Sequence, residues 1–197
     1  MSRVGKGLWS ALPVWAVVAI ALVAVGAAGA QRNNKVISAS GIVVGARSLD
    51  VDERLPAAAV TFGRPASAGS DLEIGVANCW VKWGGGIATL FHSAAQPNAA
   101  CKPATDFVLK LATVTSAGWR TPRGLQIGDT LTRLRQLYPA ARSDKPCFNS
   151  APGEYPGGWW GLVRRHDPAG GAGGQACVLA AAVVNNRVTA FRVASLY

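Results

Sequence analysis

The fold of this chain is decided by the stretch Gly124-Leu125-Gln126-Ile127-Gly128-Asp129-Thr130 and the apolar positions that follow it. Asp129 or Thr130 can cap a helix, because a short side-chain oxygen accepts hydrogen bonds from backbone N–H groups that lack a partner in the first turn. The next apolar side chains recur at the spacing of one helix face: Leu131, Leu134, Leu137 and Tyr138. Pro139 then stops the run, so the sequence predicts a short helix over 131–138.

A fainter copy of this pattern lies upstream and begins at Gly41-Ile42-Val43-Val44-Gly45. Its apolar positions come later and end at a turn: Leu55, Ala58, Ala59 and Phe62, followed by Gly63-Arg64-Pro65. Pro56 restricts where a helix can begin, so we expect a helix over 55–62. The simplest interpretation is one structural unit used twice.

Segments typical of β-strands follow each copy. The expected strands cover 71–83, 87–91 and 107–112 in the first half, and 159–165, 177–184 and 187–196 in the second. Asn185-Asn186 suits a two-residue hairpin turn, because Asn tolerates positive φ. We therefore predict an α+β fold of two tandem repeats, 41–121 and 122–197. Each repeat has a short helix followed by about three or four antiparallel strands, with the helices on one sheet face.

The first thirty residues resemble an export signal. Arg3 and Lys6 precede an uncharged run over 8–30, which predicts a signal peptide or an N-terminal hydrophobic helix retained as a membrane anchor. Small residues at Ala28-Gly29-Ala30 fit a cleavage site. Residues 31–40 are expected to be a polar linker. The sequence thus predicts an exported domain, either secreted or anchored to the cytoplasmic membrane with the domain outside.

The four cysteines lie beyond this segment, two in each half: Cys79, Cys101, Cys147 and Cys177. An even number in an exported chain favours disulfides, and three pairings are possible. Pairing Cys79 with Cys101, and Cys147 with Cys177, is the one that cross-links each repeat internally. The cysteines lack the close C-x-x-C spacing of a metal site, so no metal or cofactor is expected.

A family resemblance follows from these features. A helix opened by a Gly-x-x-x-Gly turn, closed at an aromatic-Pro or Phe-Gly-x-Pro end and followed by an antiparallel sheet, used twice with one disulfide per unit, resembles the tandem-repeat β-lactamase inhibitory proteins. It is also similar to the related small lipoproteins of outer-membrane assembly. The resemblance covers 41–65 and 124–139, and elsewhere only the order of the strands. It implies a binding or assembly role without catalysis.

The chain is basic, since beyond residue 30 it carries 18 of its 20 Lys and Arg against all 10 acidic residues. This excess favours anionic partners, which for an exported protein are lipid headgroups and acidic envelope polymers more often than nucleic acid. A basic, soluble surface without a partner is the simpler interpretation, because most of these cations are scattered singly.

A catalytic function has few residues to draw on. The histidines are His92 and His166, and no nucleophile elbow, zinc helix or P-loop motif occurs. If the chain is an enzyme, the best candidate is a small envelope hydrolase that uses His166, Asp167 and Glu154. Histidines at strand ends without catalytic function are the more economical interpretation.

Five tryptophans beyond the leader form a heavy aromatic load: Trp80, Trp83, Trp119, Trp159 and Trp160. Most should be core residues, but aromatic faces interleaved with cations can also form a binding surface. Because Trp159 and Trp160 are adjacent, one should face inward and the other outward if they lie on a strand. The predicted partner-binding set is Trp159, Trp160, Tyr155, Arg164 and Arg165. We therefore expect a non-catalytic binding domain of the bacterial-type cell envelope, for a protein or an anionic component; its oligomeric state stays open.

Overall fold

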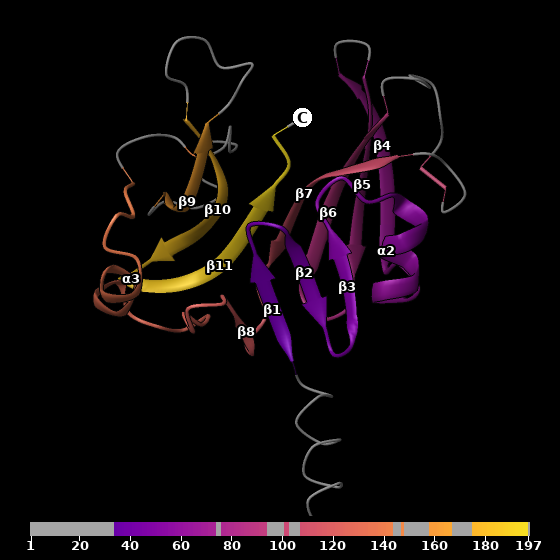
Figure 1. Cartoon of the computed structure of the whole chain (residues 1–197). Coiled ribbons are helices and arrows are strands. Elements are labelled where there is room, and N and C mark those ends of the chain that lie inside the picture. Colours follow the sequence, from indigo (N-terminus) through magenta and orange to yellow (C-terminus); the bar gives the residue numbers. More distant parts are fainter. Residues whose placement is uncertain are drawn as a thin grey trace, which may run out of the picture.

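The computed structural model describes residues 34–73, 76–93, 101–102, 107–143, 147, 158–166 and 175–196. These residues form two short helices and two β-sheets, and strands dominate the structure (Figure 1). The leader predicted over 1–30 lies outside the described residues. Neither helix of the described residues is long and apolar enough to cross a membrane.

The larger sheet has seven strands, each antiparallel to its neighbours. Their spatial order is β4 (Ser67–Glu73), β5 (Val76–Trp83), β6 (Ile87–Ser93), β7 (Val108–Val114), β11 (Arg187–Ala194), β10 (Gln175–Val184) and β9 (Trp159–His166). The two halves of the chain meet where β7 pairs with β11, from Val114 opposite Phe191 to Leu111 opposite Ala194. Asn185 and Asn186 have the positive φ values expected of the turn between β10 and β11.

The smaller sheet has four strands in the order β3-β2-β1-β8. A meander of β1 (Lys35–Ser38), β2 (Gly41–Val44) and β3 (Arg47–Asp50) comes first, and β8 (Trp119–Arg120) adds to β1 in parallel. Strand β1 lies within the range expected to be a linker. The residue ranges assigned to the two halves stay predictions.

The two helices lie where the sequence predicts them. Helix α2 (Leu55–Phe62) has the predicted bounds, and helix α3 (Leu131–Leu137) is one residue shorter than predicted. Thr130 is the N-cap of α3, since its Oγ1 accepts a hydrogen bond from the backbone N–H of Arg133 at 3.2 Å.

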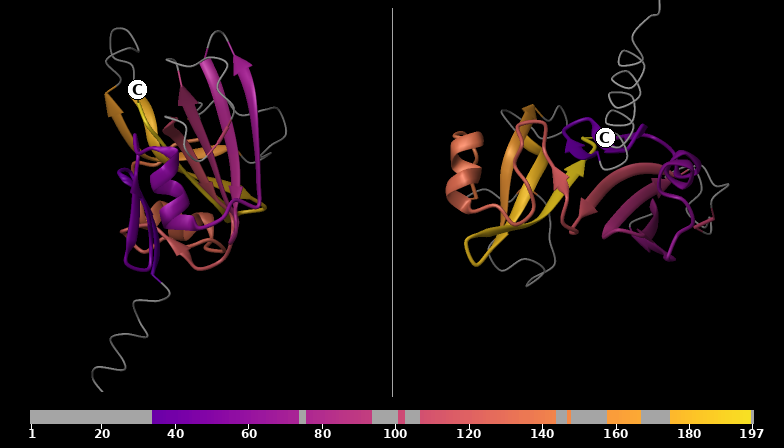
Figure 2. Two further views of the ribbon diagram at one scale, coloured as in Figure 1. Left: turned by 90° about the vertical axis from the view of Figure 1, so that its right-hand side faces the viewer. Right: turned by 90° about the horizontal axis from the view of Figure 1, so that it is seen from below.

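One core fills the space between a face of the seven-stranded sheet and a second layer, made of the small sheet, α2 and α3 (Figure 2). The large sheet contributes Phe91, Leu109 and Phe191, the small sheet Ile37, Ile42 and Leu49, and the helices Leu55, Ala58 and Leu134. All nine are at most 3% exposed. Burying a Leu, Ile or Phe side chain contributes about 1.5–3 kcal/mol, so this contact between the layers holds the domain together.

The opposite face of the seven-stranded sheet carries a second, smaller apolar cluster on β9–β11: Trp159, Ala180, Ala182 and Ala190. Arg192 lies beside it and is only 7% exposed. Its Nε donates to Thr113 Oγ1 at 2.8 Å, and its guanidinium carbon lies 4.3 Å from the centre of the Trp159 ring. The alanines leave room for these two large side chains above the sheet.

The predicted fold class is wrong. The chain is mostly β, and it does not consist of two helix-plus-sheet repeat units. The two Gly-x-x-x-Gly copies take different structures. Gly41 to Val44 form a strand between β1 and β3, whereas 124–130 forms turns with two isolated bridges, from Gln126 to Arg120 and from Thr130 to Arg187. The segment 71–83, expected to be one strand, covers the end of β4 and all of β5. The resemblance to the tandem-repeat inhibitors, which used those units, stays a hypothesis.

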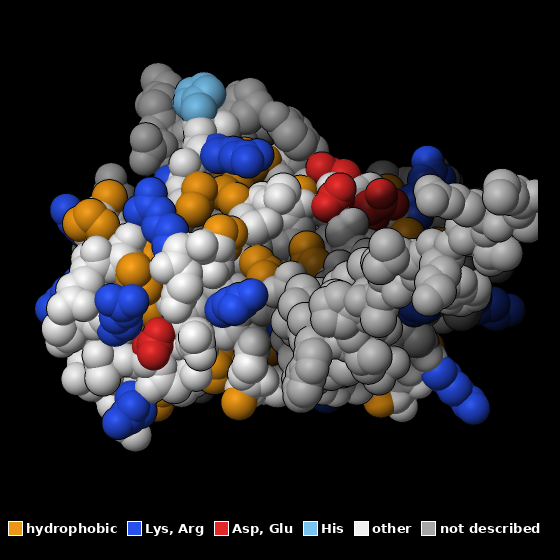
Figure 3. All heavy atoms as spheres, turned by 60° about the horizontal axis from the view of Figure 1, so that its bottom comes forward, with side chains coloured by type: hydrophobic (Ala, Val, Ile, Leu, Met, Phe, Trp, Pro, Cys, Tyr) orange, Lys and Arg blue, Asp and Glu red, His pale blue; other side chains and the backbone are white. Residues whose placement is uncertain are grey.

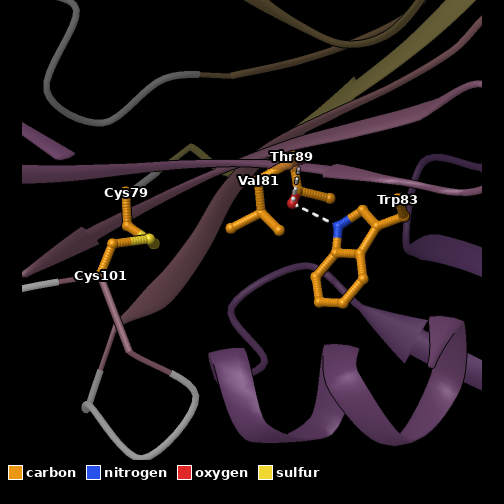
Figure 4. The surroundings of a disulfide bond; sticks show 5 residues. All are labelled: Cys79, Val81, Trp83, Thr89 and Cys101. Carbon is orange, nitrogen blue, oxygen red and sulfur yellow. Dashed lines mark hydrogen bonds between the residues drawn. A yellow bond between two sulfur atoms is a disulfide. The ribbon is translucent and has the colours of Figure 1, made fainter. Parts of the chain in front are cut away.

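Both predicted disulfides are present, Cys79–Cys101 and Cys147–Cys177, with Cα–Cα distances of 5.2 and 5.0 Å. Cys79 is fully buried in the main core near Val81, and Cys101 packs against that core (Figure 4). Cys147 instead packs against the cluster around Trp159. The two cross-links therefore lie on opposite faces of one sheet, and they indicate an oxidising, extracellular or periplasmic environment.

Candidate functional site

The structure separates the residues predicted to bind a partner. Trp159 is 5% exposed and faces the small cluster, whereas Trp160 packs against the edge of the main core and is half-buried. Trp160 is therefore the more exposed member of the pair. Arg164 and Arg165 continue along β9, and Tyr155 lies outside the described residues.

Trp160 forms one wall of a surface hollow of about 340 Å³ between α3 and β9. Its described lining residues are Arg135, Pro139, Ala141, Arg142, Ser143 and Trp160. Arg135 lies in the last turn of α3, and its guanidinium carbon is 5.1 Å from the centre of the Trp160 ring. A cation over an aromatic face at this distance is an attractive contact, so Trp160 helps to hold the Arg135 head group in place.

Arg142 fixes the other side of this hollow. Its backbone O accepts from the N–H of Gly161 at 2.9 Å, which places residue 142 beside β9 next to Trp160. Its Nη1 donates to the carbonyl oxygens of Pro139 at 3.1 Å and Ala141 at 2.9 Å. These bonds occupy one nitrogen of the guanidinium fork, whose other N–H groups are further donors.

The charge distribution supports a basic site on this side of the molecule. Residues 107–197 carry eleven Lys and Arg against four Asp and Glu, a net charge of +7, whereas residues 31–106 carry seven against six, a net charge of +1. In Figure 3, Lys and Arg side chains are spread over the side of the molecule that bears α3, and most acidic side chains gather over the other side. Such a field attracts anions to the hollow.

The remaining predicted cations lie elsewhere. Arg164 has its Nη2 3.8 Å from the Sγ of Cys147, next to the second disulfide. Arg165 lines a different, smaller hollow of about 150 Å³, together with His166. The structure thus brings Trp160 together with two arginines, but not with the two that were predicted.

The predicted hydrolase residues are only partly described, since Glu154 and Asp167 lie outside the described residues. His166 shares the smaller hollow with Asp52 and Ser195 instead. The Ser195 hydroxyl donates to the Asp52 carboxylate, and Lys110 Nζ lies 3.8 Å from the same carboxylate. A hydroxyl bonded directly to a carboxylate has no imidazole base on its proton, so this contact does not activate Ser195 as a nucleophile.

The other tryptophans are largely structural. Trp119 is fully buried, and Trp83 is 4% exposed and donates from Nε1 to Thr89 Oγ1 at 2.8 Å. Trp80 differs, because 47% of it is exposed on β5.

Sequence reasoning missed Arg135 and Arg142. Arg135 lies on a helix and Arg142 in the segment after it, and both line the hollow because that segment pairs with β9. The difference in net charge between the halves was the available signal.

Comparison with family models, with curated proteins and with solved structures finds no match for this chain.

Proposed function

We propose that this chain is an exported, disulfide-stabilised, non-catalytic binding module of the cell envelope, and that it contacts an anionic envelope component at the Trp160 hollow. The observation that carries the proposal is the stacking of Arg135 on Trp160 beside Arg142, on the basic half of the chain. The two disulfides and the hydrophobic run over 8–30 support export. The module is either secreted or held at the cytoplasmic membrane by 8–30.

The chemistry of the hollow favours a ligand that joins an anionic group to a flat apolar surface. Guanidinium groups bind carboxylates and phosphates with paired, charge-assisted hydrogen bonds. The exposed part of the Trp160 ring offers a surface on which a sugar ring or an apolar chain can stack. Acidic glycopolymers combine both features.

The test is a titration of the oxidised full chain with two anionic polymers, polyglycerol phosphate and polygalacturonate, with neutral dextran as the blank. Tryptophan fluorescence, to which Trp160 contributes, follows binding, and repeating the titration at several salt concentrations reports the electrostatic share of binding. Arg135→Gln should weaken binding roughly five- to tenfold, because it removes a charge-assisted contact.

Arg133→Gln is the matched control, since it removes the same charge from an exposed position of α3 outside the hollow. We expect this control to change affinity less than about twofold, the effect of a distant screened charge. Equal losses in the two variants would place binding elsewhere, and polymers that bind no better than dextran would refute the anionic ligand.

A small envelope hydrolase is the second candidate, favoured by the shared hollow of His166, Asp52 and Ser195. The Ser195–Asp52 bond argues for a structural role of this serine. A screen of ester substrates decides between a catalytic and a structural role of Ser195. Turnover that Ser195→Ala abolishes without changing the unfolding midpoint would establish the hydrolase.

A further inference from the structure

The two sheets have four edge strands, β3 and β8 in the small sheet and β4 and β9 in the large one. Unpaired edges expose rows of N–H and C=O groups that can pair with another chain, and proteins usually cover or interrupt them. In the described residues, other parts of the chain bond to three of the four edges, β3, β8 and β9, but not to β4.

The three protected edges are covered in different ways. Along β3, Arg47 Nη1 donates to the Val60 carbonyl of α2 at 2.6 Å, and Thr61 Oγ1 donates to the Ser48 carbonyl at 3.1 Å. Gln126 bridges to β8, and the segment at Arg142 bridges to β9. Each of these edges is thereby closed to a long added strand.

Among the described residues, no bridge or side-chain contact covers the outer edge of β4, and its charged residues are Asp71 and Glu73. Its residues Ser67 to Asp71 are all exposed, and its seven residues include no Pro, no Lys and no register shift against β5. Small side chains also allow a new strand to approach closely. Within the part of the chain that the structure describes, the edge is therefore long, regular and free to pair.

Trp80 lies next to this edge on the face away from the main core. It is directly opposite Gly69 of β4, and a Cβ atom at Gly69 would have no neighbour within 4 Å. Because Gly69 has no side chain, 47% of the Trp80 residue stays exposed beside the open edge. Exposed aromatic residues of this kind are frequent anchors of protein interfaces.

We propose that β4 is the contact surface for a second copy of this chain, which adds its own β4 in antiparallel orientation about a two-fold axis through Ser70. The strand's charge pattern favours this arrangement over parallel, in-register pairing. Parallel, in-register pairing would place Asp71 next to the partner's Asp71, whereas the two-fold places it opposite the partner's Gly69, beside the exposed Trp80. It also brings Glu73 opposite the partner's Ser67. Within each copy Ser67 pairs with Lys82 of β5, so a residue of opposite charge lies one strand further along.

The two-fold joins the two seven-stranded sheets into one continuous sheet. Closed two-fold dimers are the commonest assemblies of soluble proteins, since one self-complementary patch serves both copies. The inference does not depend on the Trp160 hollow, which lies across the sheet near β9.

Cysteine cross-linking in the oxidised full chain tests both the contact and its register. Ser70→Cys places one thiol beside its copy, within the Cα separation of about 4.4–6.8 Å that a disulfide requires. Ala68→Cys on the same strand faces the partner's Leu72 instead, so like thiols stay apart. Thr132→Cys, exposed on α3, measures random collision.

Under mild oxidation we expect Ser70→Cys to form cross-linked dimers at least roughly tenfold faster than either control, because pairing raises the effective thiol concentration. A mixture of Gly69→Cys and Asp71→Cys chains should cross-link to each other and little to themselves, which checks the register without altering Ser70. Equal rates at Ser70, Ala68 and Thr132 would overturn the proposal. Cross-linking of Ala68→Cys as fast as Ser70→Cys would also overturn it, because it would show parallel pairing.

Discussion

Gly161→Ala tests how closely β9 passes the disulfide between Cys147 and Cys177. A Cβ atom at Gly161 would lie 2.8 Å from Cys177 Sγ and 2.9 Å from Cys147 Sγ. The sulfurs are bonded to each other, so neither can swing away alone. The φ of Gly161 is not positive, so backbone strain adds nothing. We expect the free energy of unfolding to fall by about 1–3 kcal/mol, the usual cost of adding a methyl group to filled space.

The effect of Gly161→Ala on the free energy of unfolding should change sign once the sulfurs are removed. In a Cys147→Ala/Cys177→Ala background both sulfur contacts are gone, and the remaining close contact, with Arg164 Nε at 3.0 Å, involves a long side chain that can shift. Gly161→Ala should therefore stabilise by about 0.4–1 kcal/mol through the entropy of the unfolded chain. The background itself should lose about 3.6 kcal/mol in the chain-entropy model, given a separation of 30 residues.

Denaturant unfolding of the four proteins, followed by tryptophan fluorescence, measures this cycle. The two backgrounds should differ in their response to Gly161→Ala by at least about 1.4 kcal/mol, the sum of the smaller estimates. Responses that agree within about 0.5 kcal/mol, the usual limit of additivity, would refute the packing argument.

Two further stability predictions follow from single contacts. Thr130→Ala should lower the free energy of unfolding by about 1 kcal/mol, because it removes the cap of α3, whereas Thr132→Ala in the same helix should be neutral or stabilising; thermal unfolding of both compares them. Cys79→Ala/Cys101→Ala should cost about 3.4 kcal/mol from a separation of 22 residues, and denaturant unfolding that shows less than half this loss would contradict the chain-entropy estimate.

The local elements were predictable because their signals are short-range. Helix α2 begins beside Pro56 and ends at Phe62 as expected, and Thr130 and Pro139 bracket α3. The hairpin turn at Asn185 and Asn186 follows from residues that tolerate positive φ. Each of these features is decided within a few residues of sequence.

The arrangement of the strands was not predictable in the same way. Pairing of β7 with β11 and of β1 with β8 joins residues some 80 positions apart, and no local pattern encodes it. Strand β4 was missed in part because Ser67-Ala68-Gly69-Ser70 has no apolar alternation. Within the site, Trp160 was predicted, but Arg135 and Arg142 depend on how α3 and the segment after it pack against β9.

The position of β11 has a consequence for how this protein is assembled during synthesis. This strand comes after every other strand in chain order, yet it lies inside the seven-stranded sheet, between β7 and β10. Until residues 187–194 leave the ribosome, β7 is a strand with an unpaired edge, and strands β4 to β7 are not yet joined to β9 and β10. A chain that ends before this strand would leave the edge of β7 open to other chains, so we expect it to aggregate more readily than the full chain.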